Sequence, residues 1–63
     1  MTKVACPVCG SLTLDEKGQF DICGVCGWED DNVQRDDPDF DGGANDMSLN
    51  QAKEAFAARK PIT

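Results

Sequence analysis

The sequence contains no histidine and no tyrosine, and it has few large apolar side chains. Leucine, isoleucine, valine and phenylalanine together account for only twelve of its 63 residues. A chain of this length buries only about 60% of the surface that its unfolded form exposes. So few apolar residues, combined with a net charge of −6, are typical of chains that stay disordered unless disulfides or a metal add stability.

The sequence also lacks an apolar segment suited to export or membrane insertion. Its first ten residues, "MTKVACPVCG", contain no apolar stretch of the kind found in a signal peptide. No apolar run approaches the roughly 20 residues that a membrane-spanning helix needs. We therefore expect a cytoplasmic protein, whose thiols are kept reduced, and this favours metal binding over disulfides.

All four cysteines lie in two Cys-x-x-Cys pairs in the first part of the chain. Two intervening residues allow a tight turn to direct both sulfur atoms of a pair to one point, and Gly10 and Gly27 follow the pairs where such turns need conformational freedom. Paired motifs of this spacing are typical of tetrahedral metal sites. The predicted metal ligands are Cys6, Cys9, Cys23 and Cys26.

Zinc is the expected metal. Four protein ligands leave no open position for catalysis, so we expect one structural ion. Three alternatives remain. Iron can occupy a rubredoxin-like Cys₄ site, and overexpressed protein can carry either metal. Two disulfides would require an exported form. A thioredoxin-like redox pair would require a longer chain with a βαβ unit.

The remaining sequence predicts a small α+β domain over residues 1–63, with a pair of metal-binding turns. Alternating polar and apolar residues on either side of Gly18 predict a β-hairpin over residues 11–23 that separates the cysteine pairs. Pro38 and the two glycines after it predict an irregular acidic loop from Trp28 to Asp46. Ser48, with glutamine three residues later, predicts the start of a C-terminal helix over about residues 49–60.

The acidic loop allows two interpretations. "DPDFDGG", residues 37–43, matches the opening of a calcium-binding EF-hand loop, but Ser48 occupies the position that requires a glutamate. The alternative is that these carboxylates form turns and accept hydrogen bonds from backbone N–H groups. We expect the apolar residues Val33 and Phe40 to be covered by this loop.

A third feature is the acidic stretch "WEDD". Trp28 is the only tryptophan, so it is either the core anchor beside the metal or an exposed anchor for a partner. Seven acidic residues and one basic residue lie between Trp28 and Asp41. This charge opposes binding to nucleic acid and predicts a basic protein partner. We also expect no membrane contact and a monomeric chain. The predicted partner-binding residues are Trp28, Glu29, Asp30 and Asp31.

The sequence resembles the cysteine-rich CPCC family of small bacterial proteins. The resemblance runs from about Cys6 to Phe56 and includes the blocks "WEDD", "DPD", "GGAN" and "SLNQA" in the family's order. It implies a zinc-ribbon-like fold but no activity, since the family has no established one. Val8 stands where the family motif has a further cysteine, and Gly24 and Gly27 replace a proline and a bulky residue of the second pair.

The sequence therefore predicts a non-enzymatic zinc module that binds a protein partner through its acidic loop. Without histidine or tyrosine, and with a closed metal shell, no pair of nucleophile and general base is evident. The alternative function is a redox-responsive or zinc-responsive regulator, in which oxidation of the thiolates releases the metal.

Overall fold

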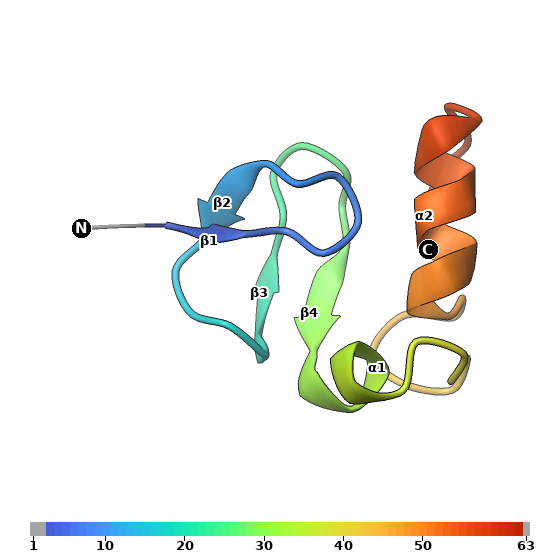
Figure 1. Ribbon diagram of the computed structural model, residues 1–63, viewed down its shortest axis with the longest axis horizontal. Helices are drawn as coiled ribbons and strands as arrows, with labels where there is room; N and C mark the ends of the chain where they lie inside the picture. Colours follow the sequence, from blue (N-terminus) through green and yellow to red (C-terminus); the bar gives the residue numbers. More distant parts are fainter. Residues whose placement is uncertain (1–2, 63) are drawn as a thin grey trace.

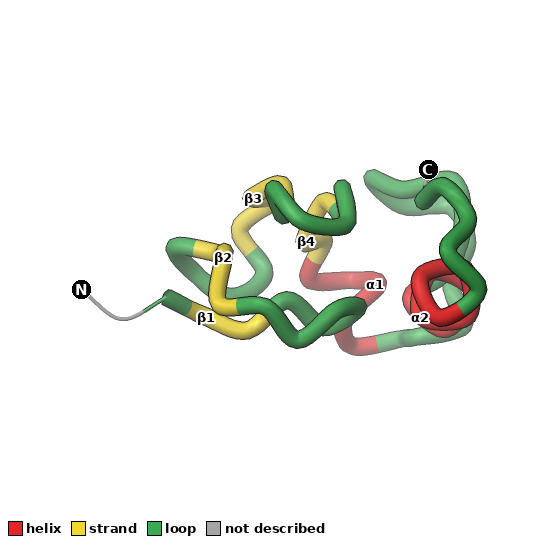
Figure 2. Tube along the Cα trace, turned by 90° about the horizontal axis from the view of Figure 1, so that it is seen from above, coloured by secondary structure: helices red, strands yellow, loops and turns green. Residues whose placement is uncertain are grey.

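The computed structural model describes residues 3–62, which form four short strands and two helices (Figure 1). Two antiparallel hairpins lie side by side, and the longer helix lies at the opposite end of a flat body measuring 30 × 23 × 13 Å (Figures 1 and 2). The elements are β1 (Val4–Ala5), β2 (Leu12–Leu14), β3 (Gln19–Ile22), β4 (Glu29–Asp31), α1 (Asn32–Asp36) and α2 (Leu49–Ala57).

Each Cys-x-x-Cys pair forms the turn of its own hairpin. In the first hairpin, β1 pairs with β2, and the Gly10 N–H donates to the Cys6 carbonyl at 2.8 Å. In the second, β3 pairs with β4, and the Gly27 N–H donates to the Cys23 carbonyl at 2.9 Å. Both glycines have positive φ, 79° and 87°, which glycine adopts without steric cost. The same turn is thus built twice.

The predicted hairpin over residues 11–23 is wrong, although its two strands are present as β2 and β3. These strands pair with β1 and β4 instead of with each other. Gly18 has a positive φ of 69° as expected, but its N–H donates to the Asp30 carboxylate at 2.7 Å. The segment between β2 and β3 is therefore a crossover between two hairpins. Alternation of side chains identifies a strand but not its partner.

The acidic stretch after Trp28 is more regular than its glycine and proline content predicts. It begins with strand β4 and helix α1, and Asp31 caps α1 by accepting a hydrogen bond from the Val33 N–H at 2.8 Å. Val33 and Phe40 are 52% and 38% exposed, so the prediction that the loop covers them is wrong. The buried side chains of this stretch are polar ones instead, among them Gln34 and Asn45.

Gln34 and Asn45 hold the acidic segment through buried hydrogen bonds. The Gln34 amide nitrogen lies 3.0–3.2 Å from the carbonyls of Phe40, Asn45 and Met47. The Asn45 side chain accepts from the Glu29 N–H at 3.0 Å and donates to the Glu29 carbonyl at 2.7 Å, as an adjacent strand would. Polar side chains, not apolar packing, therefore determine the path of this segment.

Replacement of Gly43 by alanine is expected to destabilise the protein by about 2 kcal/mol. A Cβ atom at Gly43 would lie 2.5 Å from the Asp31 carboxylate and 2.8 Å from the Gln34 side chain, and both side chains are held by hydrogen bonds in the interior. Thermal unfolding of the metal-loaded protein measures the change. Gly24→Ala is the matched control, because a Cβ atom there meets nothing within 4 Å. Equal losses of stability in the two variants would contradict the prediction.

The C-terminal helix begins as predicted and ends earlier. Ser48 and Gln51 form the reciprocal capping box, whereas α2 ends at Ala57, not near residue 60. Arg59 adopts a positive φ of 57°, and the Lys60 N–H donates to the Ala55 carbonyl at 2.7 Å, which is the geometry of a Schellman motif. The tail therefore turns back along α2 (Figure 1).

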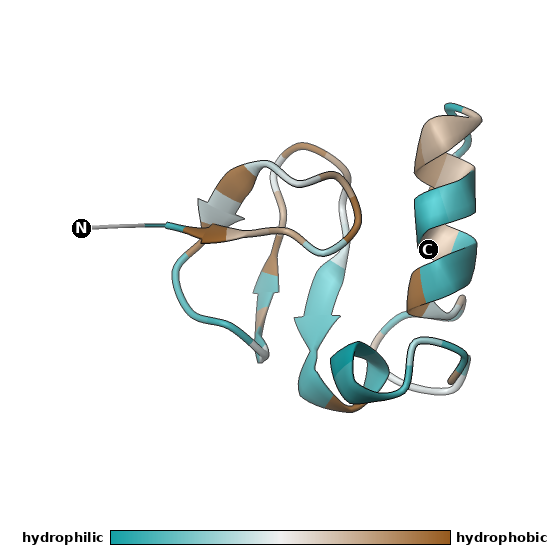
Figure 3. Cartoon of the chain, viewed as in Figure 1, coloured by the Kyte–Doolittle hydropathy of each residue, from teal (hydrophilic) through white to brown (hydrophobic). Residues whose placement is uncertain are grey.

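The hydrophobic core is small and includes two cysteines. Its buried members are Cys6, Leu14, Cys23, Trp28, Leu49 and Ala52. Ile62, in the returning tail, is half-buried against this cluster. Figure 3 shows the resulting contrast between mostly hydrophilic β4 and α1 and the more hydrophobic hairpin turns. Among residues 3–62, no helix has the length and apolar character to cross a membrane.

Candidate metal centre

The two hairpins bring all four predicted ligands together. The four Sγ atoms lie within 4.8 Å of one another, with Cys6 Sγ 3.5 Å from Cys26 Sγ and Cys9 Sγ 3.7 Å from Cys23 Sγ. A tetrahedral metal with Zn–S bonds of about 2.3 Å would separate its sulfur ligands by about 3.8 Å. The four free cysteines therefore form a cluster that could hold a metal ion.

The four cysteines of the cluster differ in their exposure to solvent. Cys6 and Cys23, the first cysteines of the two pairs, are buried, whereas Cys9 and Cys26 are half-buried. Each of the two short sulfur–sulfur contacts joins a buried cysteine of one hairpin to a half-buried cysteine of the other. The cluster is thus the junction of the two hairpins, and a metal ion there would bind them to each other.

The thiols differ in their electrostatic surroundings. Burial opposes ionisation of Cys23, but hydrogen bonds from the Thr13 hydroxyl and from the N–H groups of Cys26 and Val25 together outweigh it and lower its pKa to about 6. Burial raises the pKa values of Cys6 and Cys26. Because a metal binds thiolates, its binding displaces the remaining protons, and acidic pH weakens it.

Thr13 is a part of the site that the sequence analysis did not identify. Its hydroxyl, on β2 of the first hairpin, donates to Cys23 Sγ of the second hairpin at 3.0 Å. Alternation along "SLTL" places Thr13 on a strand, but the target of its hydroxyl depends on how the two hairpins pack. Groups that bond to metal ligands in this way orient them and affect metal affinity.

The substitution Thr13→Val is expected to weaken metal binding by about 10-fold, since loss of such a contact typically costs 10- to 100-fold in affinity. Valine has nearly the shape of threonine but cannot donate a hydrogen bond to Cys23. Competition with a chromogenic chelator at neutral pH measures the affinity. Thr13→Ser, which keeps the hydroxyl, is the control and should bind metal nearly as tightly as the natural chain does. Equal losses of metal affinity in the two variants would mean that packing, not the hydrogen bond, is responsible.

The four residues predicted to bind a partner do not form an exposed surface. Trp28, Asp30 and Asp31 are buried, and only Glu29 is partly exposed. Trp28 belongs to the core cluster that contains the cysteines, which confirms the interpretation of Trp28 as the core anchor. The charges of Asp30 and Asp31 suggested exposure, but both carboxylates have partners inside the protein, so the predicted surface is wrong at these three positions.

Asp30, on β4, is paired with Arg35 of α1, and Arg35 in turn contacts the first hairpin. Its carboxylate accepts hydrogen bonds from the Gly18 N–H at 2.7 Å and from Trp28 Nε1 at 3.4 Å. The Arg35 Nε lies 2.9 and 3.0 Å from its two oxygens, and Arg35 Nη2 donates to the Ala5 carbonyl at 3.3 Å. This ion pair holds α1 against both hairpins beside the cysteine cluster.

The described carboxylates of the acidic loop do not converge on one point as those of an EF-hand loop do. Asp37 accepts a hydrogen bond from the Asp39 N–H at 3.3 Å, and Asp39 accepts from the Asn50 side chain at 2.8 Å. In the part of the chain from residue 3 to residue 62, the four cysteines are the only group of three or more ligating side chains that converge on one point. The contacts of Asp37 and Asp39 agree with the interpretation of turn-forming carboxylates.

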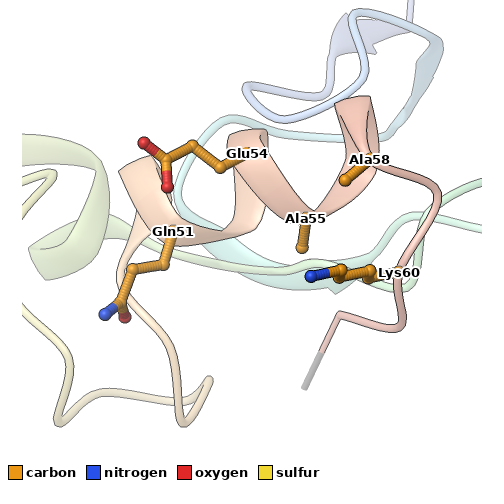
Figure 4. Close-up of a pocket in the computed structure, with 5 residues that line it drawn as sticks. All are labelled: Gln51, Glu54, Ala55, Ala58 and Lys60. Atoms are coloured by element: carbon orange, nitrogen blue, oxygen red, sulfur yellow. The ribbon is translucent and has the colours of Figure 1, made fainter.

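One surface concavity of about 370 Å³ lies along α2 and the returning tail (Figure 4). Its lining residues are Gln51, Glu54, Ala55, Ala58 and Lys60. None of them is a cysteine, and Glu54 is the only carboxylate among them. The concavity therefore offers no converging set of metal ligands, and the cysteine cluster is the candidate site.

Comparison with known proteins places this architecture in a family. The family model described as "Cysteine-rich CPCC" matches residues 4–59, a range that includes both hairpins, the acidic segment and α2. No curated protein matches the chain.

Proposed function

The chain belongs to the cysteine-rich CPCC family, and on that premise we propose that it is a non-enzymatic zinc module that binds a basic protein through its acidic segment. Two structural features support the proposal: a four-cysteine cluster that joins the two hairpins, and a row of exposed carboxylates on a segment fixed by buried hydrogen bonds. In this proposal the metal maintains the fold and the carboxylates recognise the partner.

Zinc is the metal that we propose for the cluster. Four thiolates complete a tetrahedral shell, and the resulting zinc-ribbon-like centre has no open position for a substrate or a reactive water. Elemental analysis of protein prepared in medium containing both zinc and iron tests the assignment. One zinc ion per chain supports it, whereas a stable iron centre with the colour of a ferric tetrathiolate would contradict it.

The proposed partner surface is the acidic segment, residues 36–46. Its exposed carboxylates are Asp36, Asp37, Asp39, Asp41 and Asp46. No lysine or arginine occurs from Asp36 through Ala52, and the preceding Arg35 is paired with the buried Asp30, so no basic residue lies within the acidic segment. Such a surface attracts a positively charged partner and accelerates association at low ionic strength. This observation carries the proposal.

The acidic segment is also held in one conformation before it meets a partner. Gln34 bonds to carbonyls along it, and Asp31 accepts from the Ala44 N–H at 2.9 Å. Phe40, 38% exposed, lies between Asp39 and Asp41 and offers an apolar contact among the charges. A surface that is already ordered loses less conformational entropy when it binds.

A charge-matched pair of variants tests the proposal. The triple variant Asp36→Asn, Asp37→Asn, Asp41→Asn removes three charges from the acidic segment, and Asp15→Asn, Glu16→Gln, Glu54→Gln removes three exposed charges elsewhere. Immobilised natural chain and the second variant should retain the same basic protein from the source cell's extract and release it as salt rises. The first variant should lose it. Equal retention by both variants, or retention independent of salt, would contradict the proposal.

A further inference from the structure

Two short sulfur–sulfur contacts in the cluster link different hairpins. Cys6 Sγ lies 3.5 Å from Cys26 Sγ, and Cys9 Sγ lies 3.7 Å from Cys23 Sγ. Each pair contains one buried cysteine, Cys6 or Cys23, and one half-buried cysteine, Cys26 or Cys9. An oxidant from solution therefore meets the half-buried member of each pair, and the buried member lies within 3.7 Å of it across the junction.

We propose that a hydroperoxide converts this site into two disulfides that cross the junction, Cys9–Cys23 and Cys6–Cys26, with loss of the metal. This inference is independent of the acidic segment and of any partner. It concerns which thiols combine and what becomes of the fold, neither of which follows from the ability of the cluster to hold a metal.

The chemistry requires one hydroperoxide for each disulfide. The half-buried thiolate attacks the peroxide, the O–O bond breaks, and a sulfenic acid and a hydroxide or alkoxide form. The buried thiolate across the junction then attacks the sulfenic sulfur, an S–S bond forms, the S–O bond breaks and hydroxide leaves. Two thiolates lose two electrons and the peroxide gains them. The metal loses two ligands with each disulfide.

The connection across the junction determines what happens to the fold. A disulfide needs an S–S distance of about 2.05 Å, so each pair must close by less than 2 Å, while the hairpins keep their positions. The two new bonds then join the hairpins where the metal had joined them. Disulfides within each Cys-x-x-Cys turn would instead leave the hairpins unconnected. The metal-free oxidised chain is therefore expected to stay folded, with Trp28 still buried.

The positions of lysine and arginine allow a direct test on the natural, zinc-loaded chain. Trypsin cleaves after Lys3, Lys17 and Arg35, so Cys6 and Cys9 lie in the peptide 4–17 and Cys23 and Cys26 in the peptide 18–35. Hydrogen peroxide is added stepwise while a chromogenic chelator records metal release. Free thiols are then blocked, and the protein is digested without reductant. Mass spectrometry distinguishes joined peptides from separate ones, and fragmentation identifies the linked cysteines.

The expected result is loss of nearly all separate peptides 4–17 and 18–35 in favour of one joined species, with Cys9 linked to Cys23 and Cys6 linked to Cys26. The near-UV circular dichroism of Trp28 should persist after the metal has been released.

As a control, oxidation of the chelated chain in denaturant should favour the short links within each pair, because small loops close most readily. Separate peptides with internal disulfides from the native protein, the pairing Cys6–Cys23 with Cys9–Cys26, or loss of the Trp28 signal on oxidation would each overturn the proposal.

Discussion

Removal of the metal is expected to unfold the entire chain. Among residues 3–62, the buried apolar side chains apart from cysteine are only Leu14, Trp28, Leu49 and Ala52. Structural zinc contributes about 10–16 kcal/mol of binding free energy in small zinc peptides at pH 7, and small domains have a net stability of about 5–15 kcal/mol. Without the metal, the conformational entropy lost on folding should outweigh the stabilisation that the remaining interactions provide.

Trp28 reports this transition, because its ring lies in the same cluster as Cys6 and Cys23. Addition of a strong chelator under reducing conditions should abolish the near-UV circular dichroism of Trp28 and the far-UV signal of α2 in one cooperative step. Adding zinc back should restore both signals. The substitution Cys9→Ser should have the same effect as chelation.

The matched control is Val25→Ser in the second cysteine turn. Val25 is 59% exposed, and the N–H group that it places 3.4 Å from Cys23 Sγ is retained in serine. This variant should keep the metal and the fold. A native-like near-UV spectrum in the reduced, metal-free natural chain would show that the core is sufficient on its own and would contradict the prediction.

The substitution Asp30→Asn is expected to lower the free energy of unfolding of the metal-loaded protein by about 3 kcal/mol, the lower end of the cost of breaking a buried ion pair. Asparagine fits the same space, but it carries no charge to balance Arg35. The groups around the Asp30 carboxylate are all hydrogen-bond donors: the Gly18 N–H, the Trp28 indole N–H and the Arg35 guanidinium. In asparagine, one of the two polar side-chain atoms is itself a donor. A donor must therefore face a donor.

Denaturant unfolding of the zinc-loaded protein measures this loss. Asp41→Asn is the control, because it removes the same charge from an exposed position, where substitutions usually change stability by less than about 0.5 kcal/mol. Adding Arg35→Met to Asp30→Asn should recover part of the stability, since it removes the unpaired cation. Similar stabilities for Asp30→Asn and Asp41→Asn would contradict the assigned role of the buried pair.

Several features of the protein follow from short sequence patterns. The spacing of Cys6, Cys9, Cys23 and Cys26 predicted which side chains converge, because two residues between cysteines and a glycine after each pair define a turn that needs no distant contact. The Ser48 and Gln51 capping box located the start of α2 for the same reason: both bonds of the box lie within one turn of helix. Strands β2 and β3 were likewise evident from local alternation.

The pairing of those strands and the burial of the acidic residues depend on contacts between distant parts of the chain. Nothing within residues 11–23 excludes a hairpin; β2 and β3 separate because β1 and β4 offer them partners on either side of a cysteine turn.

Asp30 and Asp31, charged residues in an acidic stretch, were predicted to be exposed. They are buried because Gly18, Arg35 and Ala44 supply hydrogen-bond donors from other parts of the chain, and a charge can leave water only where the folded chain provides such partners. The four ligands of the metal centre were therefore predictable from spacing, whereas the hairpin topology, the Thr13 contact and the exposed carboxylates of the acidic segment became evident only when the whole chain was folded.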